Sequence, residues 1–156
     1  MLVLLIKLLL VLIMNESRSI HELAYFNFLR TGSWIEDQIK LALRPFGLTH
    51  AQLNALYVLS ERDPEPVSAS DLKGKILVSN PDVTRLMDRL VKKGYVLRKT
   101  CPENRRKIDI SLTGSGRDLF EQAHQTVKQA LGNFFEKQLT ENEAKELRKI
   151  MHKMRE

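Results

Sequence analysis

Cysteine is the residue that this sequence lacks most clearly, since Cys101 is the only one in 156 residues. A single cysteine excludes an intramolecular disulfide framework and a cysteine-rich zinc site, and it fits a reducing compartment such as the cytoplasm. The four histidines show no H-x-x-x-H or comparable ligand spacing: His21, His50, His124 and His152. We therefore expect no metal site and no other cofactor.

Signals for catalysis and for a membrane span are also missing. Cys101 has no evident base partner and "LTGSG" lacks the spacing of a phosphate loop, so we assign no catalytic residue and expect no enzyme. The apolar run over residues 1–14 would span only about 21 Å as a helix, short of a bilayer core of about 30 Å. It has no signal-peptide cleavage site, and no membrane partner is expected. Two interpretations of residues 1–14 stay open: a helix buried in a dimer, or an extension ahead of a start at Met14.

Positive charge is concentrated in one part of the chain. The net charge is +6, and residues 70–112 hold eleven basic and five acidic side chains, while the remainder is balanced. Such a localised basic patch is typical of a protein that binds a polyanion, because each Lys or Arg that meets a phosphate releases condensed counterions. The alternative is a solvated charged face, which charge alone does not exclude.

Apolar periodicity and helix-start signals predict a mostly helical single domain. A long helix is expected over about residues 19–44, ended by Pro45. Capping boxes predict further helix starts at Thr49, Ser68 and Thr140. A polar turn after a strand predicts one more long helix from residue 113 onward.

The helix predicted after Ser79 is divided most clearly into two faces. Ser79 is expected to cap it, with Pro81 in its first turn. One face is an apolar stripe that we expect to be buried: Val83, Leu86, Met87, Leu90 and Val91. The opposite face is polar: Asn80, Asp82, Thr84, Arg85, Asp88, Arg89 and Lys92.

Two stretches of alternating apolar residues follow this helix. "YVLRKT" and "KIDISL" predict two strands, which "CPENRR" joins as a hairpin with Arg105 and Arg106 at its tip. A short helix, a turn, an amphipathic helix and a basic hairpin are the layout of a winged helix-turn-helix. A helix fits the major groove of DNA, and an arginine on a loop suits the narrow, negative minor groove. Residues 49–112 are therefore predicted to form a DNA-binding winged lobe.

The sequence also resembles the MarR family of bacterial transcriptional regulators over about residues 20–155. The resemblance rests on "FGLTHAQLNALYVL", "SASDL", "VTRLMDRLVKKGYVLRK", "PENRRK" and "LTGSG", in the family's order and spacing. It implies a mainly α fold with a small β-hairpin wing, in which helices over residues 19–48 and 113–156 intertwine in a homodimer. It further implies a ligand-responsive repressor that binds a pseudo-palindromic operator in double-stranded DNA.

The predicted DNA contacts lie on the amphipathic helix and the hairpin. They are Ser79, Asn80, Asp82, Thr84, Arg85, Arg89, Lys92, Arg105, Arg106 and Lys107. By resemblance, Arg106 is the wing arginine that enters the minor groove, although Cys101 and Asn104 stand where the family usually has acidic residues. The alternative for Arg85 and Arg89 is a solvated face, and Asp88 with Lys92 would then be an ordinary helix ion pair.

Three aromatic side chains of the first long helix have two alternative roles: Tyr25, Phe28 and Trp34. The resemblance implies the wall of a pocket for a small aromatic or lipophilic effector, whereas packing in the dimer core is the structural interpretation. Cys101 lies among basic residues, which raises the alternative of a redox sensor, but that is not the favoured role. The alternative to a DNA-binding regulator is a protein-interaction module that presents its basic face to an acidic partner.

Overall fold

The chain is mainly helical with a small antiparallel sheet, which confirms the predicted fold class. The computed structural model describes residues 19–76, 82–102, 104 and 107–156, so residues 1–14 lie outside the described part. Two compact units divide the chain between Asp37 and Gln38. The elements in chain order are α2 (Ile20–Leu43), the 3-10 helix η1 (Arg44–Phe46), α3 (His50–Ser60), β1 (Val67–Ser68), α4 (Ala69–Lys75), α5 (Val83–Lys92), β2 (Val96–Thr100), β3 (Ile108–Leu112), α6 (Gly114–Gln138) and α7 (Glu141–Lys153).

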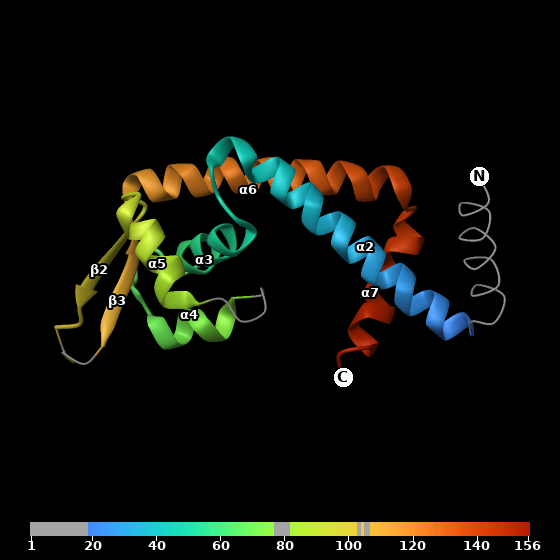
Figure 1. Cartoon of the computed structure of the whole chain (residues 1–156), viewed down its shortest axis with the longest axis horizontal. Helices are drawn as coiled ribbons and strands as arrows, with labels where there is room; N and C mark the ends of the chain where they lie inside the picture. Colours follow the sequence, from blue (N-terminus) through green and yellow to red (C-terminus); the bar gives the residue numbers. More distant parts are fainter. Residues whose placement is uncertain (1–18, 77–81, 103, 105–106) are drawn as a thin grey trace, which may run out of the picture. The chain divides into compact units, whose positions relative to one another are not determined.

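Helix α3 occupies the centre of the core in the unit that begins at Gln38. It contacts α4, α5, α6 and β3. The helices α3, α4 and α5 and the strands lie beside the first half of α6 (Figure 1). Leu56 and Leu59 of α3 are 0% and 2% exposed. Complete burial of a leucine side chain stabilises a fold by about 1.5–3 kcal/mol, so these residues are a large part of what holds the winged lobe together.

Local signals set the start of α3. Gly47 ends η1 in the left-handed region, with φ of 60°. The Thr49 hydroxyl then accepts the Gln52 N–H at 3.2 Å, and the Gln52 side-chain oxygen accepts the Thr49 N–H at 3.0 Å. This reciprocal pair is the predicted capping box, and it satisfies two N–H groups that the helix itself leaves unpaired.

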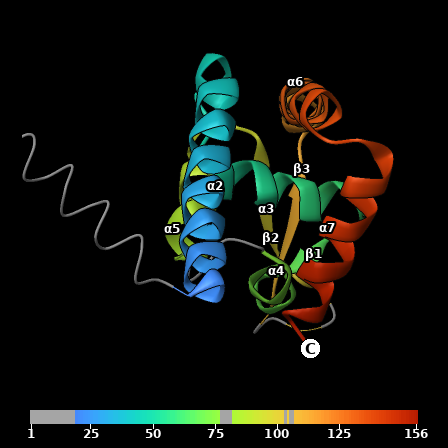
Figure 2. The ribbon, with the colours of Figure 1, turned by 90° about the vertical axis from the view of Figure 1, so that its right-hand side faces the viewer.

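The sheet has three strands, one more than the sequence predicted. Strands β2 and β3 form the expected antiparallel hairpin, and β1 pairs with the other edge of β3, with Val67 opposite Ile110. A two-residue strand is too short to show alternation, so no pattern indicated it. In Figure 2, α6 is seen nearly end-on and the strands extend away from it. Because Ser68 also caps α4, β1 fixes the start of that helix against the sheet.

Two details of α5 differ from the prediction. Its N-cap is Asp82, whose carboxylate accepts the Arg85 N–H at 3.1 Å, so the predicted cap at Ser79 is wrong. Asp82 stands directly before the buried stripe and therefore reaches the first turn. Val91 is 37% exposed although we expected it to be buried. At 3.6 residues per turn it lies about 80° away from Val83, at the edge of the stripe.

The turn from β3 into α6 confirms the helix predicted from residue 113 onward, which Thr113 caps. The Thr113 hydroxyl accepts the Gly116 N–H at 2.9 Å and donates to the Gly94 carbonyl at 2.8 Å. Gly116 packs so closely on Tyr95 that a Cβ would overlap the Tyr95 carbonyl oxygen. Glycine is therefore required where α6 crosses the entry to β2.

A second capping box starts α7 at Thr140. The Thr140 N–H and hydroxyl donate to a Glu143 carboxylate oxygen at 2.8 and 2.7 Å. The side-chain hydrogen bond from Thr140, and after it the backbone hydrogen bond, lowers the pKa of Glu143.

Within the described residues, no helix is long and apolar enough to cross a bilayer.

Candidate nucleic-acid interface

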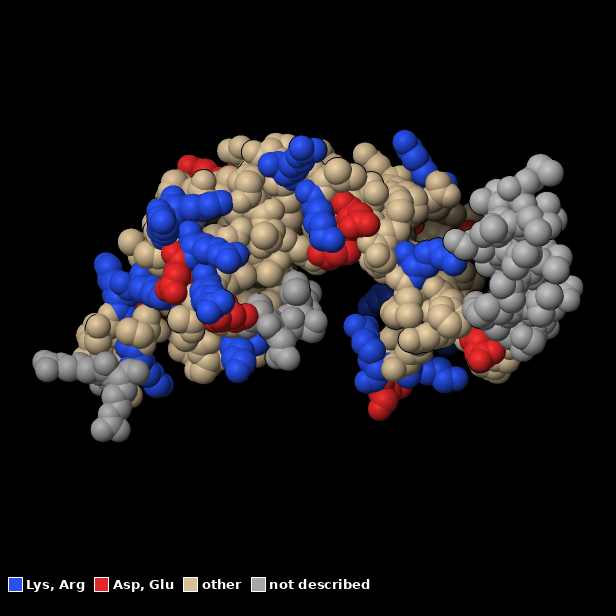
Figure 3. Space-filling model, viewed as in Figure 1, with Lys and Arg blue, Asp and Glu red and all other residues tan. Residues whose placement is uncertain are grey.

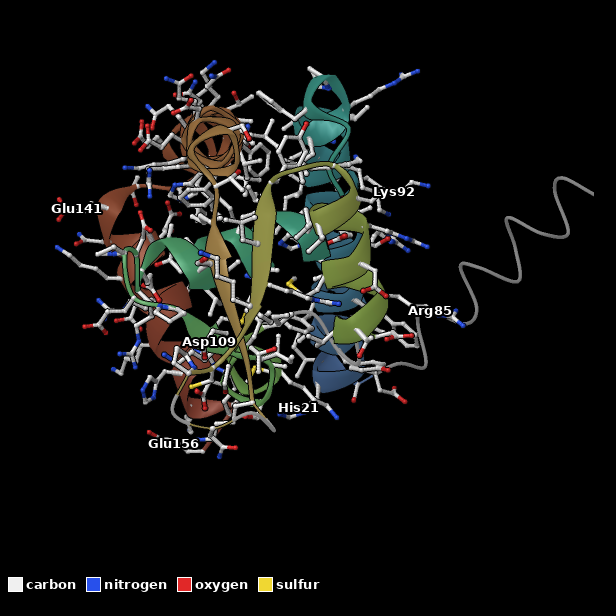
Figure 4. The ribbon with its side chains drawn as sticks, turned by 90° about the vertical axis from the view of Figure 1, so that its left-hand side faces the viewer. His21, Arg85, Lys92, Asp109, Glu141 and Glu156 are labelled. Carbon is white, nitrogen blue, oxygen red and sulfur yellow. The ribbon has the colours of Figure 1, made fainter. Side chains whose placement is uncertain are left out.

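Helix α5 buries one side and presents the other to solvent. Val83, Met87 and Leu90 are no more than 9% exposed and face the core. The predicted contact residues of the described helix are all exposed: Asp82, Thr84, Arg85, Arg89 and Lys92. Figure 4 shows Arg85 and Lys92 projecting from α5 away from the strands. The amphipathic pattern therefore places the polar residues together on an accessible helix face.

Arg85 is loosely held at the start of that face. Its Nε lies 3.2 Å from Oδ2 of Asp82, and the two side chains are 80% and 57% exposed. An ion pair so open to water contributes little to stability, so a phosphate or a base edge can replace the carboxylate. Asp82, predicted as a contact, is also the N-cap of α5, so it orients the first turn of the helix.

Asp88 pairs with Arg98 of β2, so the ordinary helix pair with Lys92 considered for it is wrong. Arg98 Nη1 lies 2.5 Å from Asp88 Oδ1, and its Nη2 donates to the Thr84 carbonyl at 3.1 Å. The long Arg98 side chain reaches from β2 to α5. The spacing of residues within α5 alone could not reveal this contact. This role of Arg98 was not predicted from the sequence, where its one signal was an arginine at a strand position that faces the core.

The C-terminal end of α5 is anchored to the turn that precedes α3. Lys93 donates from Nζ to the Gly47 carbonyl at 2.7 Å, which ties the helix end to the turn before α3. Gly94 follows with φ of 76°, in the left-handed region that glycine adopts without steric cost. The last turn of α5 is thus held by the turn between η1 and α3.

The hairpin carries the second set of predicted contacts. Lys107 is exposed, and its backbone pairs with Cys101, whose N–H donates to the Lys107 carbonyl at 3.0 Å. Cys101 is half-buried. Four predicted contacts lie outside the described residues: Ser79, Asn80, Arg105 and Arg106. Lys107 directly precedes β3, whose partner strand β2 packs against α5.

Basic side chains dominate the surface of this region. Figure 3 shows Lys and Arg gathered over α5 and the hairpin, with a few acidic side chains among them. The residues behind this charge are those of the 70–112 segment, which holds the whole excess of positive charge. Among the described residues, no three His, Cys, Asp or Glu side chains come together to hold a metal ion. The arrangement suits the electrostatic recognition of a polyanion.

Comparison with known proteins decides the family. Residues 48–108 match the sequence profile of the MarR family. The multiple antibiotic resistance protein MarR of Escherichia coli is 35% identical over 112 residues, covering 72% of this chain and 76% of the relative. The chain belongs to the MarR family. It is therefore a transcriptional regulator, and the resemblance drawn from its motifs is confirmed.

Other MarR-family proteins agree in sequence and in fold. An uncharacterised HTH-type transcriptional regulator of Bacillus cereus is 33% identical over 112 residues, 72% of this chain and 73% of its own. A cysteine-to-serine variant of Escherichia coli MarR, solved in complex with operator DNA, has a TM-score of 0.73 and 28% identity. The match covers 88% of this chain and 99% of that one. The MarR winged-helix fold thus extends over most of the chain.

Proposed function

We propose that this MarR-family protein is a homodimeric repressor that binds a pseudo-palindromic operator in double-stranded DNA, with α5 in the major groove. The observation that carries the proposal is the exposed polar face of α5 beside a basic hairpin. The related Escherichia coli MarR, solved complexed with operator DNA, supports the same ligand class here. In a two-fold dimer the half-sites would lie about one helical turn, or 10 to 10.5 bp, apart.

The proposed contacts divide into base readers and phosphate binders. Arg85 and Thr84 lie in the first turn of α5, where a helix reaches the base edges, and Arg85 is suited to a guanine. Arg89 and Lys92 lie further along, and Lys107 lies on the hairpin, so we assign these to phosphates. The remaining proposed DNA contacts of the helix are Ser79, Asn80 and Asp82. Those of the wing are Arg105 and Arg106.

Exposed apolar side chains on α2 and α7 support the homodimer. On α2, Ile20 and Leu41 are 73% and 59% exposed, and on α7, Ile150 and Met154 are 53% and 65% exposed. Large apolar side chains left exposed along a helix favour association with another chain. A second copy of this chain is the occupant we propose.

Selection of a duplex from a random-sequence pool tests the DNA-binding function. Wild type should enrich one pseudo-palindrome and bind it more tightly than a scrambled duplex, with affinity that falls as salt rises. Arg85→Ala should lose about 1–3 kcal/mol on the enriched duplex and relax its base preference. Lys92→Ala is the matched control, since loss of a phosphate contact should weaken binding to both duplexes alike.

The outcome of that selection also separates the DNA regulator from a protein-interaction module. Equal, weak binding of wild type to every duplex would leave only a basic surface. No binding even at low salt would contradict the proposal and favour an acidic protein partner. We further propose that the protein acts in the cytoplasm, where bacterial DNA lies, and that it works by binding alone, without catalysis.

We also propose a small aromatic or lipophilic effector as the ligand that releases the DNA. Tyr25, Phe28 and Trp34 are 58%, 45% and 38% exposed in the single chain, so a ligand or the dimer partner has access to them. Trp34 is the only tryptophan, and its fluorescence distinguishes the two roles. Emission that changes with substituted phenols or benzoates at fixed protein concentration supports the pocket, and a change with protein dilution alone supports the dimer core.

A further inference from the structure

Arg98 occupies a strand position that would ordinarily hold an apolar residue. Val96, which shares its face of β2, and Ile110, which lies opposite it on β3, are each 1% exposed. The Arg98 side chain is only 29% exposed. A guanidinium at the edge of a core must have partners, because an unpaired buried charge is costly.

Both partners of Arg98 lie on α5, one helical turn apart. One nitrogen of the planar guanidinium meets the Asp88 carboxylate at 2.5 Å, and the other donates to the Thr84 carbonyl at 3.1 Å. The two bonds define direction as well as distance, because the guanidinium fork is rigid. Arg98 therefore fixes how the first turn of α5 lies against the hairpin.

Apolar packing is incomplete at the same place. An open cavity of about 300 Å³ lies between α5 and the strands, lined by Val83, Met87, Ile108 and Ile110 among others. Arg98 and Thr84 also line this cavity. Side chains therefore do not fill the whole space between the strands and the first turn of α5. The bidentate bridge supplies a connection that packing does not.

We propose that Arg98 is a positioning residue for DNA recognition, which holds the hairpin and the first turn of α5 at the spacing needed to engage both grooves at once. The inference rests on the proposed DNA-binding function and deepens it. Asp88 serves the same purpose as the partner of Arg98 and reads no base itself. Thr84 connects the bridge to the proposed base contacts. Its carbonyl oxygen accepts the hydrogen bond from Arg98, while its side chain stays exposed on α5.

The sign of the charge change separates positioning from simple electrostatics. Asp88→Asn removes a negative charge from a surface that meets phosphates, so electrostatics alone would tighten DNA binding. Loss of a positioning bridge would weaken specific binding instead. Asparagine has the shape of aspartate, and an ion pair with a 57% exposed carboxylate contributes little to folding, so the variant should stay folded.

The experiment measures Kd for the duplex enriched by wild type and for its scrambled form, at several salt concentrations. Asp88→Asn and Arg98→Met should each bind the enriched duplex roughly tenfold more weakly, and the double variant no more weakly than either one. Asp88→Asn should bind the scrambled duplex at least as tightly as wild type. Lys99→Met is the matched control: it removes an exposed charge from the same strand, and any loss should be equal on the two duplexes.

Three results would overturn the inference. Asp88→Asn could bind the enriched duplex as tightly as wild type, the two single losses could add in the double variant, or Arg98→Lys could restore full affinity. The last result would mean that charge suffices without the two-pronged geometry. A wild-type protein that enriches no sequence would contradict the DNA-binding function itself, so failure of the function is distinguishable from failure of the bridge.

Discussion

The winged lobe, residues 49–112, and the two outer helices, α2 and α7, use their apolar residues in opposite ways. Within the lobe, Leu56, Leu72 and Leu90 are each 0% exposed. On the outer helices, Tyr25 of α2 is 58% exposed and Met154 of α7 is 65% exposed. The difference teaches that the lobe completes its core within one chain, whereas the outer helices leave apolar surface that is free to bind a second copy of the chain or a ligand.

Helix α2 shows the change within a single element. Near its start, Ile20 is 73% exposed, while near its end Ile39 and Leu43 are 6% and 0% exposed. The stability of the buried end comes from intramolecular contacts. The stability that the exposed end gains by association depends on protein concentration, because binding favours the folded state by mass action. The two kinds of surface are therefore separable by experiment.

The largest expected effect is on the core of the winged lobe. Leu56→Ala should lower the free energy of unfolding by about 2–5 kcal/mol, because it removes a completely buried side chain and leaves a cavity. Leu97→Ala, at a side chain that is 45% exposed in the same lobe, is the control and should cost far less. Urea unfolding followed by circular dichroism measures both variants. Equal losses would contradict the contrast between core and surface.

The next effect concerns the outer helices. Ile150→Asp should weaken dimerisation about tenfold or more, because a charge would enter an apolar interface. Lys149→Asp changes the neighbouring exposed position and should leave association nearly unchanged. Sedimentation equilibrium gives the dimer dissociation constant for each protein. Unchanged dimerisation of Ile150→Asp would mean that α7 lies outside the interface, and the comparison of the two regions would have to rest on α2.

Most of the fold could be predicted from sequence because its signals are local. The capping boxes at Thr49 and Thr140 depend on a few neighbouring residues, and each was found where expected. Alternation located the hairpin for the same reason. The error at the start of α5 has the same origin, because Ser79 and Asp82 are both residue types that cap helices well and the local sequence does not choose between them.

The missed features depend on contacts between distant residues. Strand β1 is defined by its pairing with β3, more than 40 residues further along the chain, and not by a pattern of its own. The Arg98 bridge to Asp88 requires knowledge of which helix β2 faces. The accessible face of α5 could be predicted from periodicity, but the residues that hold that face in place could not.

A smaller effect tests the local contribution of a cap inside the winged lobe. Thr49→Ala should lower the free energy of unfolding by about 1 kcal/mol, because the Gln52 N–H loses its acceptor at the start of α3. Thr49→Ser keeps the hydroxyl and should retain most of the stability. Urea unfolding at one fixed protein concentration measures both. A larger loss for Thr49→Ser than for Thr49→Ala would contradict the role of the hydroxyl.

The smallest expected effect distinguishes the two capping boxes by pH. The α3 cap uses the neutral Gln52, whereas the α7 cap uses Glu143, whose pKa is lowered by its hydrogen bonds from Thr140. A lowered folded-state pKa means that the cap contributes fully above the ordinary glutamate pKa of about 4.3 and is lost as the pH falls through the lower folded value. The NMR signal of the Thr140 N–H should therefore shift at acid pH in wild type, but not in Glu143→Gln, which resembles the α3 cap. A Thr49 N–H signal that moved in step with it would show that the whole protein, rather than the α7 cap, responds to acid.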